Sequence, residues 1–315
     1  MPTLDLQSPE TASALEVAYE TDLGTMYQGK VEDFLSSSLA RGLRGEAQLV
    51  FTSPPFPLNR KKKYGNKSGD EYLEWLRGLA SPLGDLLTED GSFVVELGNA
   101  WEPGEPVMST LALEALLELR KAGDFKICQQ FVVHNPARLP SPAQWVNIDR
   151  IRVKDAYTNV WWMSRTARPK ADNRKILVGY SKSMKKLLKR QSYNAGSRPS
   201  EHTIGETSFL VDNGGAIPPN VLTISNTVST DAYRTFCKEN DLKVHPARMA
   251  PDLAEFFIRF LTDADDLVLD PFGGSNTTGA AAEEMGRRWV TIEPQPEYVA
   301  GSQGRFTSVD PDQSS

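Results

Sequence analysis

The chain has 315 residues, of which 39% are hydrophobic, so it can form one large α/β domain or two ordinary ones and is not a disordered protein. It contains no run of roughly 18 to 20 apolar residues, and its first residues lack a secretion signal, which predicts a cytoplasmic protein with no membrane partner. Two cysteines and three histidines lie far apart in the sequence, which argues against a disulfide framework and predicts no metal site.

Short apolar segments alternate with helical patterns along the chain, and this order predicts a mostly parallel sheet with crossover helices. In chain order, we expect strands at 47–52, 92–97, 129–135, 159–164, 266–270 and 289–293. Helical spacing occurs over 70–87, where Pro82 and Gly84 predict a break, and again over 109–123 and 250–261. The pattern therefore indicates an α/β fold.

The net charge of −6 hides a strongly basic segment. Between Arg165 and Arg198 the chain has eleven Lys or Arg residues and a single Asp, and a second basic run occupies 60–67. The region from about 166 to 232 is also rich in Gly, Ser, Asn and Pro, so we expect an insertion or a small second lobe there. One basic run alone is as often a solvated face as a binding surface, but two runs favour a nucleic-acid partner.

A rigid turn, Ser53-Pro54-Pro55-Phe56, follows the first predicted strand directly. Two successive prolines fix two φ angles and remove two N–H donors, so the turn presents acceptors without competing donors. The Ser53 hydroxyl and the Pro54 carbonyl can accept hydrogen bonds from the exocyclic amino group of a nucleobase, and Phe56 offers a ring for an extruded base to stack on. The alternative is a purely structural turn that carries an aromatic side chain.

Residues 267–284 combine a strand, a glycine turn and an alanine-rich helix, which is the order of a ligand-binding βα unit. No lysine follows Gly279, which disfavours a P-loop, and the glycine spacing departs from a dinucleotide fingerprint. Asp270 would repel a pyrophosphate but suits a cationic ligand such as S-adenosylmethionine. Glu293 ends the next predicted strand, where a carboxylate can accept hydrogen bonds from both ribose hydroxyls. The alternative is that Gly273 and Gly274 form only a tight βα turn and that Glu293 is a carboxylate at the start of a helix.

Together these motifs resemble those of the β-class DNA amino-methyltransferases of restriction–modification systems. The family's catalytic motif, (Ser/Asn/Asp)-Pro-Pro-(Tyr/Phe), matches 53–56, and its Phe-x-Gly-x-Gly motif matches 272–276 except that Asn276 replaces the second glycine. Serine at the head of the first motif, with phenylalanine at its end, is typical of the cytosine-N4 branch. Asparagine tolerates left-handed backbone geometry, so the replacement at Asn276 is compatible with a glycine-like role.

The resemblance implies a Rossmann-like methyltransferase fold: a mostly parallel seven-stranded sheet with helices on both faces, circularly permuted, plus a smaller basic target-recognition region. It implies a flexible N-terminus at 1–15, a catalytic half at 16–165, the target-recognition region at 166–234, a cofactor-binding half at 235–306 and a flexible tail at 307–315.

Carried over residue by residue, the resemblance implies two groups of functional positions, catalytic and cofactor-binding. The catalytic residues are Ser53, Pro54, Pro55 and Phe56, and Glu96 is expected near the target base. The S-adenosylmethionine site comprises Asp270, Phe272, Gly274, Ser275, Asn276, Thr277 and Glu293, with 245–248 closing it. From the charge pattern, we predict DNA contacts at Arg60, Lys61, Lys62, Lys63, Lys182, Lys185, Lys186, Lys189 and Arg190.

The implied activity is methyl transfer from S-adenosylmethionine to cytosine N4 in double-stranded DNA, with the base flipped out and the product protecting DNA from a cognate restriction endonuclease. That nuclease would share the site on DNA rather than bind the chain, which is expected to be a monomer or a homodimer. Two alternatives stay open: an adenine-N6 DNA methyltransferase, and a non-catalytic DNA-binding protein with the same fold. Neither Cys128 nor Cys237 follows a proline, which disfavours the thiolate mechanism of cytosine-C5 methylation.

Overall fold

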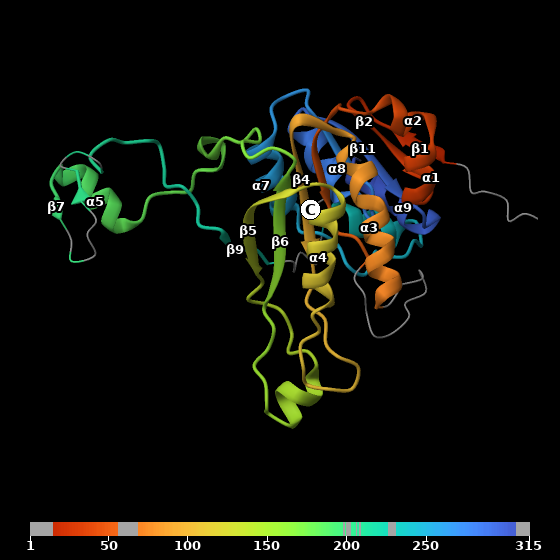
Figure 1. Ribbon diagram of the computed structural model, residues 1–315, viewed down its shortest axis with the longest axis horizontal. Helices are drawn as coiled ribbons and strands as arrows, with labels where there is room; N and C mark the ends of the chain where they lie inside the picture. The colour runs from red at the N-terminus through yellow and green to blue at the C-terminus, as the bar shows by residue number, and fades with distance from the viewer. Residues whose placement is uncertain are drawn as a thin grey trace, which may run out of the picture. The chain divides into compact units, whose positions relative to one another are not determined.

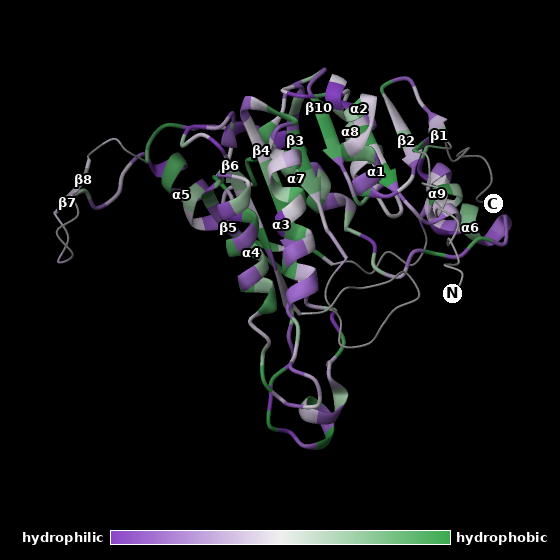
Figure 2. Cartoon of the chain, turned by 45° about the vertical axis from the view of Figure 1, so that its right-hand side comes forward, coloured by the Kyte–Doolittle hydropathy of each residue, from purple (hydrophilic) through white to green (hydrophobic). Residues whose placement is uncertain are grey.

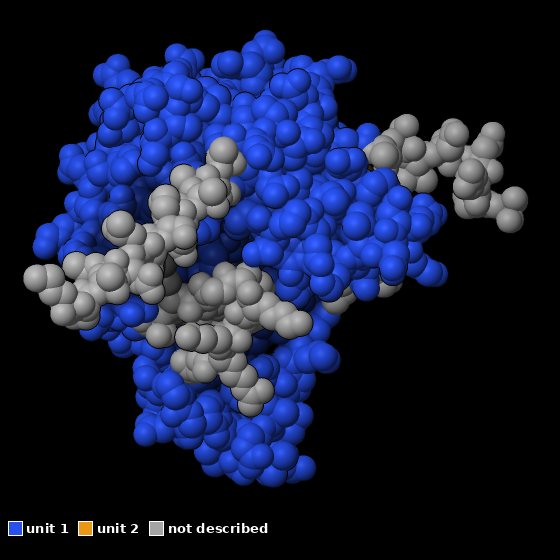
Figure 3. All heavy atoms as spheres, turned by 90° about the vertical axis from the view of Figure 1, so that its right-hand side faces the viewer, with its two compact units in different colours: residues 1–170, 220–315 blue, residues 171–219 orange. Residues whose placement is uncertain are grey.

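The computed structural model describes residues 15–55, 69–197, 199, 203–205, 207, 209–225 and 231–306. The chain divides into two compact units; unit 1 comprises residues 1–170 and 220–315, and unit 2 comprises residues 171–219. Figure 3 colours the first of them blue. The chain therefore leaves unit 1 in the region where the sequence predicts an insertion and returns to it afterwards.

A nine-stranded sheet runs through unit 1, with the order β1-β2-β11-β10-β3-β4-β6-β5-β9 (Figure 1). Its strands are β1 (Glu16–Glu20), β2 (Gly24–Gln28), β3 (Ala47–Thr52), β4 (Leu87–Leu97), β5 (Lys126–His134), β6 (Tyr157–Ser164), β9 (Val221–Thr223), β10 (Leu267–Asp270) and β11 (Arg288–Glu293). All six strands expected from the sequence are present. The predicted count of seven is too low, because the short, largely exposed strands β1 and β9 extend the two edges of the sheet.

The central strands are parallel, which places their carboxyl ends at one edge of the sheet. β2, β11, β10, β3 and β4 pair in parallel, whereas β6 runs antiparallel to both β4 and β5. Every residue of β3 is buried, and Figure 2 shows β3 and β10 in the green of hydrophobic residues. In parallel sheets of this kind, ligands bind outside the carboxyl ends of the strands.

Helices cover both faces of the sheet. In unit 1 they are α1 (Val31–Ser36), α2 (Ser38–Gly42), α3 (Asp70–Gly84), α4 (Leu111–Ala122), α6 (Ala232–Glu239), α7 (Pro251–Leu261), α8 (Thr277–Glu284) and α9 (Pro296–Ser302), with a π-helical turn η1 (Gln144–Ile148) and a 3₁₀ turn η3 (Gln303–Arg305). Of the two residues predicted to mark a break, Pro82 does not interrupt α3, which continues through it, whereas Gly84 is the last residue of the helix. Burial of Leu79 and Leu83 on the last turns offsets the backbone hydrogen bond that proline cannot make.

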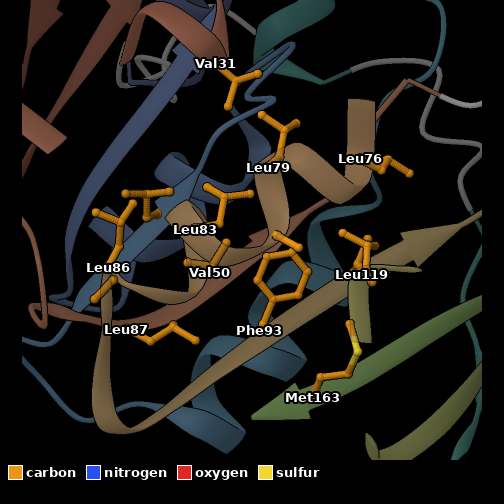
Figure 4. Close-up of a cluster of buried hydrophobic side chains, with 14 of the residues drawn as sticks. Val31, Val50, Leu76, Leu79, Leu83, Leu86, Leu87, Phe93, Leu119 and Met163 are labelled. Atoms are coloured by element: carbon orange, nitrogen blue, oxygen red, sulfur yellow. The ribbon is translucent and has the colours of Figure 1, made fainter. Parts of the chain in front are cut away.

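The larger core cluster lies between the sheet and helices α1, α3 and α4 (Figure 4). Val50 and Phe93 point from β3 and β4 toward Leu83 and Leu119, and all four side chains are buried. Each such side chain contributes about 1.5 to 3 kcal/mol by leaving water. This packing fixes the position of β3, and therefore of the turn that follows it.

Aromatic side chains fill the opposite face of the sheet, under α7. Phe51, which alternates with Val50 along β3, has its ring centroid 5.4 Å from that of Phe257. Phe131 of β5 lies 5.0 Å from the same ring, and Trp162 of β6 lies 5.1 Å from Phe260. The helix predicted at 250–261 is thus confirmed, with its apolar residues packed on the sheet.

Unit 2 contains little regular structure. Its elements are η2 (Asn173–Ile176), α5 (Lys182–Arg190) and a two-stranded ribbon of β7 (Gly196–Ser197) and β8 (Thr203–Ile204). Ser181 caps α5 by accepting a hydrogen bond from Met184 N at 3.2 Å. The apolar residues of α5 are only partly buried, as expected for a small unit without a large core.

Candidate active site

The Ser-Pro-Pro turn lies at the carboxyl end of β3, in the middle of the sheet. Ser53, Pro54 and Pro55 line a cavity of about 490 Å³ that the glycine loop after β10 also lines. These two segments are more than two hundred residues apart in sequence, and the parallel pairing of β3 with β10 brings them together. Phe56 and the basic run at 60–63 lie outside the described residues.

Glu96 at the end of β4 lies beside this turn. Its carboxylate forms a hydrogen bond with the Ser53 hydroxyl, and its Oε1 accepts a second one from Thr158 Oγ1 at 2.9 Å. Burial raises the pKa of Glu96, while the bonds from Thr158 and Ser53 oppose that shift. Because the Ser53 proton is directed at a carboxylate, the serine oxygen keeps its lone pairs for another donor. Glu96 therefore makes Ser53 an acceptor.

The loop between β10 and α8 turns through two left-handed residues. Gly274 and Asn276 both have a φ of 53°. A Cβ at Gly274 would lie 3.3 Å from the His245 ring, so the loop and this histidine are in close contact. Asn276 also caps α8, because its Oδ1 accepts a hydrogen bond from Gly279 N at 3.1 Å. The glycine-like geometry expected of Asn276 is present, together with a capping role that glycine could not supply.

Asp270 lines the cavity, but both of its carboxylate oxygens also bond to the chain itself. Oδ1 accepts from Thr52 Oγ1 at 2.7 Å and from Phe272 N at 3.0 Å, and Oδ2 accepts from Thr278 Oγ1 at 2.7 Å. Burial raises the pKa of this carboxyl, and the three bonds oppose the shift. Sequence reasoning missed this role, in which Asp270 ties the strand before the catalytic turn to the helix after the glycine loop.

Glu293 ends β11 with a carboxylate that faces the cavity and the glycine loop. It accepts hydrogen bonds from Gly274 N and Gln295 N, each at 3.0 Å. Burial raises the pKa of Glu293 to about 7; these backbone bonds lower it, and the charge of Asp270 adds to the rise. The carboxyl is therefore held in a fixed orientation at the strand tip, and it gains or loses its proton near neutral pH.

An aromatic wall completes the cavity. Phe272 stands edge-on to Trp75 of α3, with ring centroids 5.5 Å apart. The ring of Trp75 is tilted against that of Tyr72, with centroids 5.8 Å apart. The Trp75 indole N–H donates to Glu32 Oε1 at 2.7 Å, which fixes the ring plane. Phe272 was predicted as a site residue, whereas Trp75 was not. The helical spacing of 70–87 predicts a buried face, but it does not say that the face ends at a ligand cavity.

The two ends of the described chain hold the glycine loop from behind. Arg305 of η3 donates from Nη2 to Ser275 Oγ at 2.9 Å and from Nε to the Ser275 carbonyl. Tyr19 of β1 accepts from Asn276 Nδ2 at 2.9 Å and bonds to Ser302 Oγ at 2.6 Å. Ser275 and Asn276 are thus buried in a hydrogen-bond network that no sequence motif indicates. Thr277, the other predicted loop residue, also lines the cavity.

The predicted DNA-binding cations of unit 2 gather on one short helix. Lys182, Lys185, Lys186, Lys189 and Arg190 all belong to α5 and are exposed. No acidic residue stands in this helix, so its surface carries a concentrated positive charge.

Two further findings concern metal binding and membrane-spanning helices. In the part of the chain that the structure describes, no cluster of three His, Cys, Asp or Glu side chains could hold a metal ion. None of the helices within the described ranges has both the length and the apolar character needed to cross a membrane.

The sheet, with its glycine loop, acidic strand tip and Ser-Pro-Pro turn at one edge, defines a methyltransferase of the Rossmann-like class. The chain belongs to the N6/N4 DNA methylase family, whose model matches residues 47–304.

Individual relatives agree with this assignment. The chain is 46% identical over 312 residues to the type II methyltransferase M.PvuII of Proteus hauseri, which covers 97% of the chain and 91% of the relative. The solved structure of PvuII DNA methyltransferase (cytosine-N4-specific) superimposes with a TM-score of 0.75 at 40% identity, covering 94% of this chain and 90% of that one. The M1.HpyAVI–SAM complex, 17% identical with a TM-score of 0.53 over 90% of this chain and all of that one, shares the fold.

Proposed function

We propose that the chain transfers a methyl group from S-adenosylmethionine to the N4 amino group of cytosine in double-stranded DNA. The observation that carries this proposal is the single cavity lined by both the Ser-Pro-Pro turn and the loop from Asp270 to Thr278. A methyl donor and an acceptor base bound in one cavity lie within reach of each other. Cytosine rather than adenine is favoured by Ser53 and by similarity over 97% of the chain to a relative whose structure is described as cytosine-N4-specific.

The cavity fits S-adenosylmethionine in shape and in donor chemistry. Its volume of about 490 Å³ is in the range of pockets for ligands of this size. Glu293 would accept from ribose hydroxyls, the left-handed Gly274 lets the backbone approach the ligand closely, and the wall of Phe272 and Trp75 suits a planar base. When bound, the cofactor supplies a methyl group on a sulfonium sulfur that is already activated toward a nucleophile.

The chain's own residues then have to orient the acceptor. Ser53, with its proton directed at Glu96, and the Pro54 carbonyl would accept the two N–H protons of the cytosine amino group. Accepting both protons favours a pyramidal nitrogen with an available lone pair. The rigidity of Pro54 and Pro55 fixes this orientation in advance, and such positioning is the main catalytic demand when the donor is already activated.

DNA binding belongs to the same proposal. The region 166–234, including the cations of α5, would serve as the target-recognition region. The basic run at 60–63 would contact the DNA backbone close to the target base. The catalytic half at 16–165 precedes the cofactor half at 235–306, a circularly permuted order. A cytoplasmic monomer or homodimer would methylate DNA that a cognate restriction endonuclease also recognises.

Nucleoside mass spectrometry of DNA incubated with the protein and S-adenosylmethionine tests the proposal. We expect N4-methylcytosine, and N6-methyladenine in its place would favour the adenine-N6 alternative. A non-catalytic DNA-binding protein predicts no cofactor binding, which calorimetric titration of ligand-free protein with S-adenosylmethionine would detect. Sequencing that maps modified cytosines in cells expressing the chain would then identify the recognition site.

A further inference from the structure

A lobe projects from unit 1 at the carboxyl edge of the sheet. It consists of residues 98–110, which follow β4, and residues 135–156, which follow β5 and include η1. Since β5 and β4 both run antiparallel to β6, they are parallel to each other and to β3, so the lobe leaves the same edge as Ser53. Figure 1 shows it below the sheet, and Figure 3 shows the lower end of unit 1 protruding at the same height.

Internal contacts hold the two loops of the lobe together. Trp101 and Trp145 meet edge to face at 5.9 Å, and the Arg152 guanidinium lies 3.8 Å over the Trp101 ring. Within the second loop, Lys154 Nζ donates to the carbonyls of Pro136 and Arg138 at 3.1 and 3.2 Å. The two loops of the lobe therefore pack against each other and form one structural unit.

The lobe exposes aliphatic side chains to water. Val153 is 85% exposed and Leu139 is 80% exposed, and Ile148 and Ile151 are also exposed. Single exposed apolar side chains are normal on a monomer, but four of them within residues 139–153 are more than such scattered exposure, which points to a surface that contacts a partner. The lobe also has four basic and four acidic residues, so it carries no net charge toward that partner.

The base of the lobe is continuous with the acceptor site. Thr158, two residues beyond the second loop, donates to Glu96, and Glu96 bonds to Ser53. Asn159 Nδ2 donates to Asn99 Oδ1 at 3.3 Å, which ties the root of the first loop to β6. A nucleobase bound at Ser53 would therefore lie close to the foot of this lobe.

We propose that the lobe is a second DNA-contacting surface, whose exposed aliphatic side chains pack against the duplex next to the target base. This proposal rests on the proposed function. Extruding a base leaves an unstacked gap in the duplex, and proteins that deform DNA insert Leu, Ile or Met side chains between base steps. A neutral, apolar contact of this kind adds affinity that does not depend on salt, in contrast to phosphate contacts.

The test compares two double variants that remove one Leu and one Val each. The lobe variant is Leu139→Ser with Val153→Ser, and the matched control is Leu117→Ser on α4 with Val17→Ser on β1, both 55% exposed. Binding to a short duplex containing the methylated site is measured by fluorescence anisotropy between about 50 and 200 mM salt. We expect the lobe variant to bind about tenfold more weakly at every salt concentration, with an unchanged salt slope, and the control to bind as wild type.

Three results would overturn the proposal: equal affinity of the lobe variant and the control, a loss confined to low salt, or unchanged affinity with altered self-association in sedimentation. The last would identify the lobe as a contact between copies of the chain. Thermal unfolding of both variants checks the fold, and Ile148→Ser with Ile151→Ser provides a second lobe variant. Nucleoside mass spectrometry with the wild-type protein tests the proposed function separately. The binding assay does not depend on which base is methylated, so the two proposals can fail independently.

Discussion

The cofactor side of the cavity and helix α5 are built in opposite ways. Around the glycine loop, Asp270, Asn276 and Glu293 are buried, and each is hydrogen-bonded to the chain before any ligand arrives. On α5, the cations are exposed and their positions depend on flexible side chains. Buried, oriented groups act in a low dielectric and are little screened, whereas exposed charges are weakened by salt. The first region is suited to one ligand geometry, the second to any polyanion.

The largest effect should come from the turn, where the comparison predicts a loss that salt cannot change. We expect Ser53→Ala to lower kcat by about 100-fold, as loss of one preorganised hydrogen-bonding group does in other active sites. Single-turnover methylation at two salt concentrations measures this. Cofactor affinity serves as the control and should stay at the wild-type value. A kcat within twofold of wild type would show that the Ser53 oxygen does not act on the amino group.

The α5 variant should behave in the opposite way. Replacing Lys185, Lys186, Lys189 and Arg190 with Gln should weaken DNA binding by roughly 30-fold at low salt and flatten the slope of log K against log salt by about three. Cofactor binding should not change, because α5 belongs to unit 2 and the cavity is built from unit 1. Unchanged affinity at low salt would mean that α5 is only a solvated face.

Protonation of Glu293 offers a test within the buried region. Its pKa of about 7 lies above the ordinary value, so the folded protein holds this proton at pH values where the unfolded chain has lost it. The free energy of unfolding of the ligand-free protein should therefore fall as pH rises from about 4.5 to 7.

The same titration should govern the affinity for the cofactor, because only the ionised Glu293 carboxylate can accept hydrogen bonds from both ribose hydroxyls. We expect affinity for S-adenosylmethionine to rise by about tenfold between pH 6 and pH 8 in calorimetric titrations. Glu293→Gln should bind more weakly and with a flat pH profile. A wild-type profile as flat as that of the Gln variant would contradict this role.

The smallest effect should come from the support behind the loop. Arg305→Gln removes a guanidinium that bonds to Ser275, so we expect KM for the cofactor to rise about fivefold with kcat unchanged. Arg305→Lys should recover part of the loss, because it restores a donor with the same charge. Steady-state kinetics in both variants measure the split, and a fall in kcat instead would place Arg305 nearer to the reacting atoms.

Sequence reasoning succeeded where the signal is local. Periodicity predicted the buried strands 47–52 and 289–293 and the helix 250–261, and three residues chosen from the motifs, Ser53, Gly274 and Glu293, line one cavity. It failed where the signal is tertiary. Trp75 and Arg305 reach the site from elements whose own patterns mention no ligand, and the polar edge strand β1 gains its structure only by pairing with β2. The position of Thr52 opposite Asp270 follows from sheet register, which no motif encodes.

The bond between Thr52 and Asp270 also bears on how the chain could be divided. It joins two adjacent strands that belong to the first and last parts of the sequence, and unit 2 lies within the stretch that separates them. Cutting the chain within 171–219 would separate β10 and β11 from the strands that flank them in the sheet, β3 and β2. The architecture is therefore suited to fragment complementation, in which methylation reports that two separately expressed pieces have met.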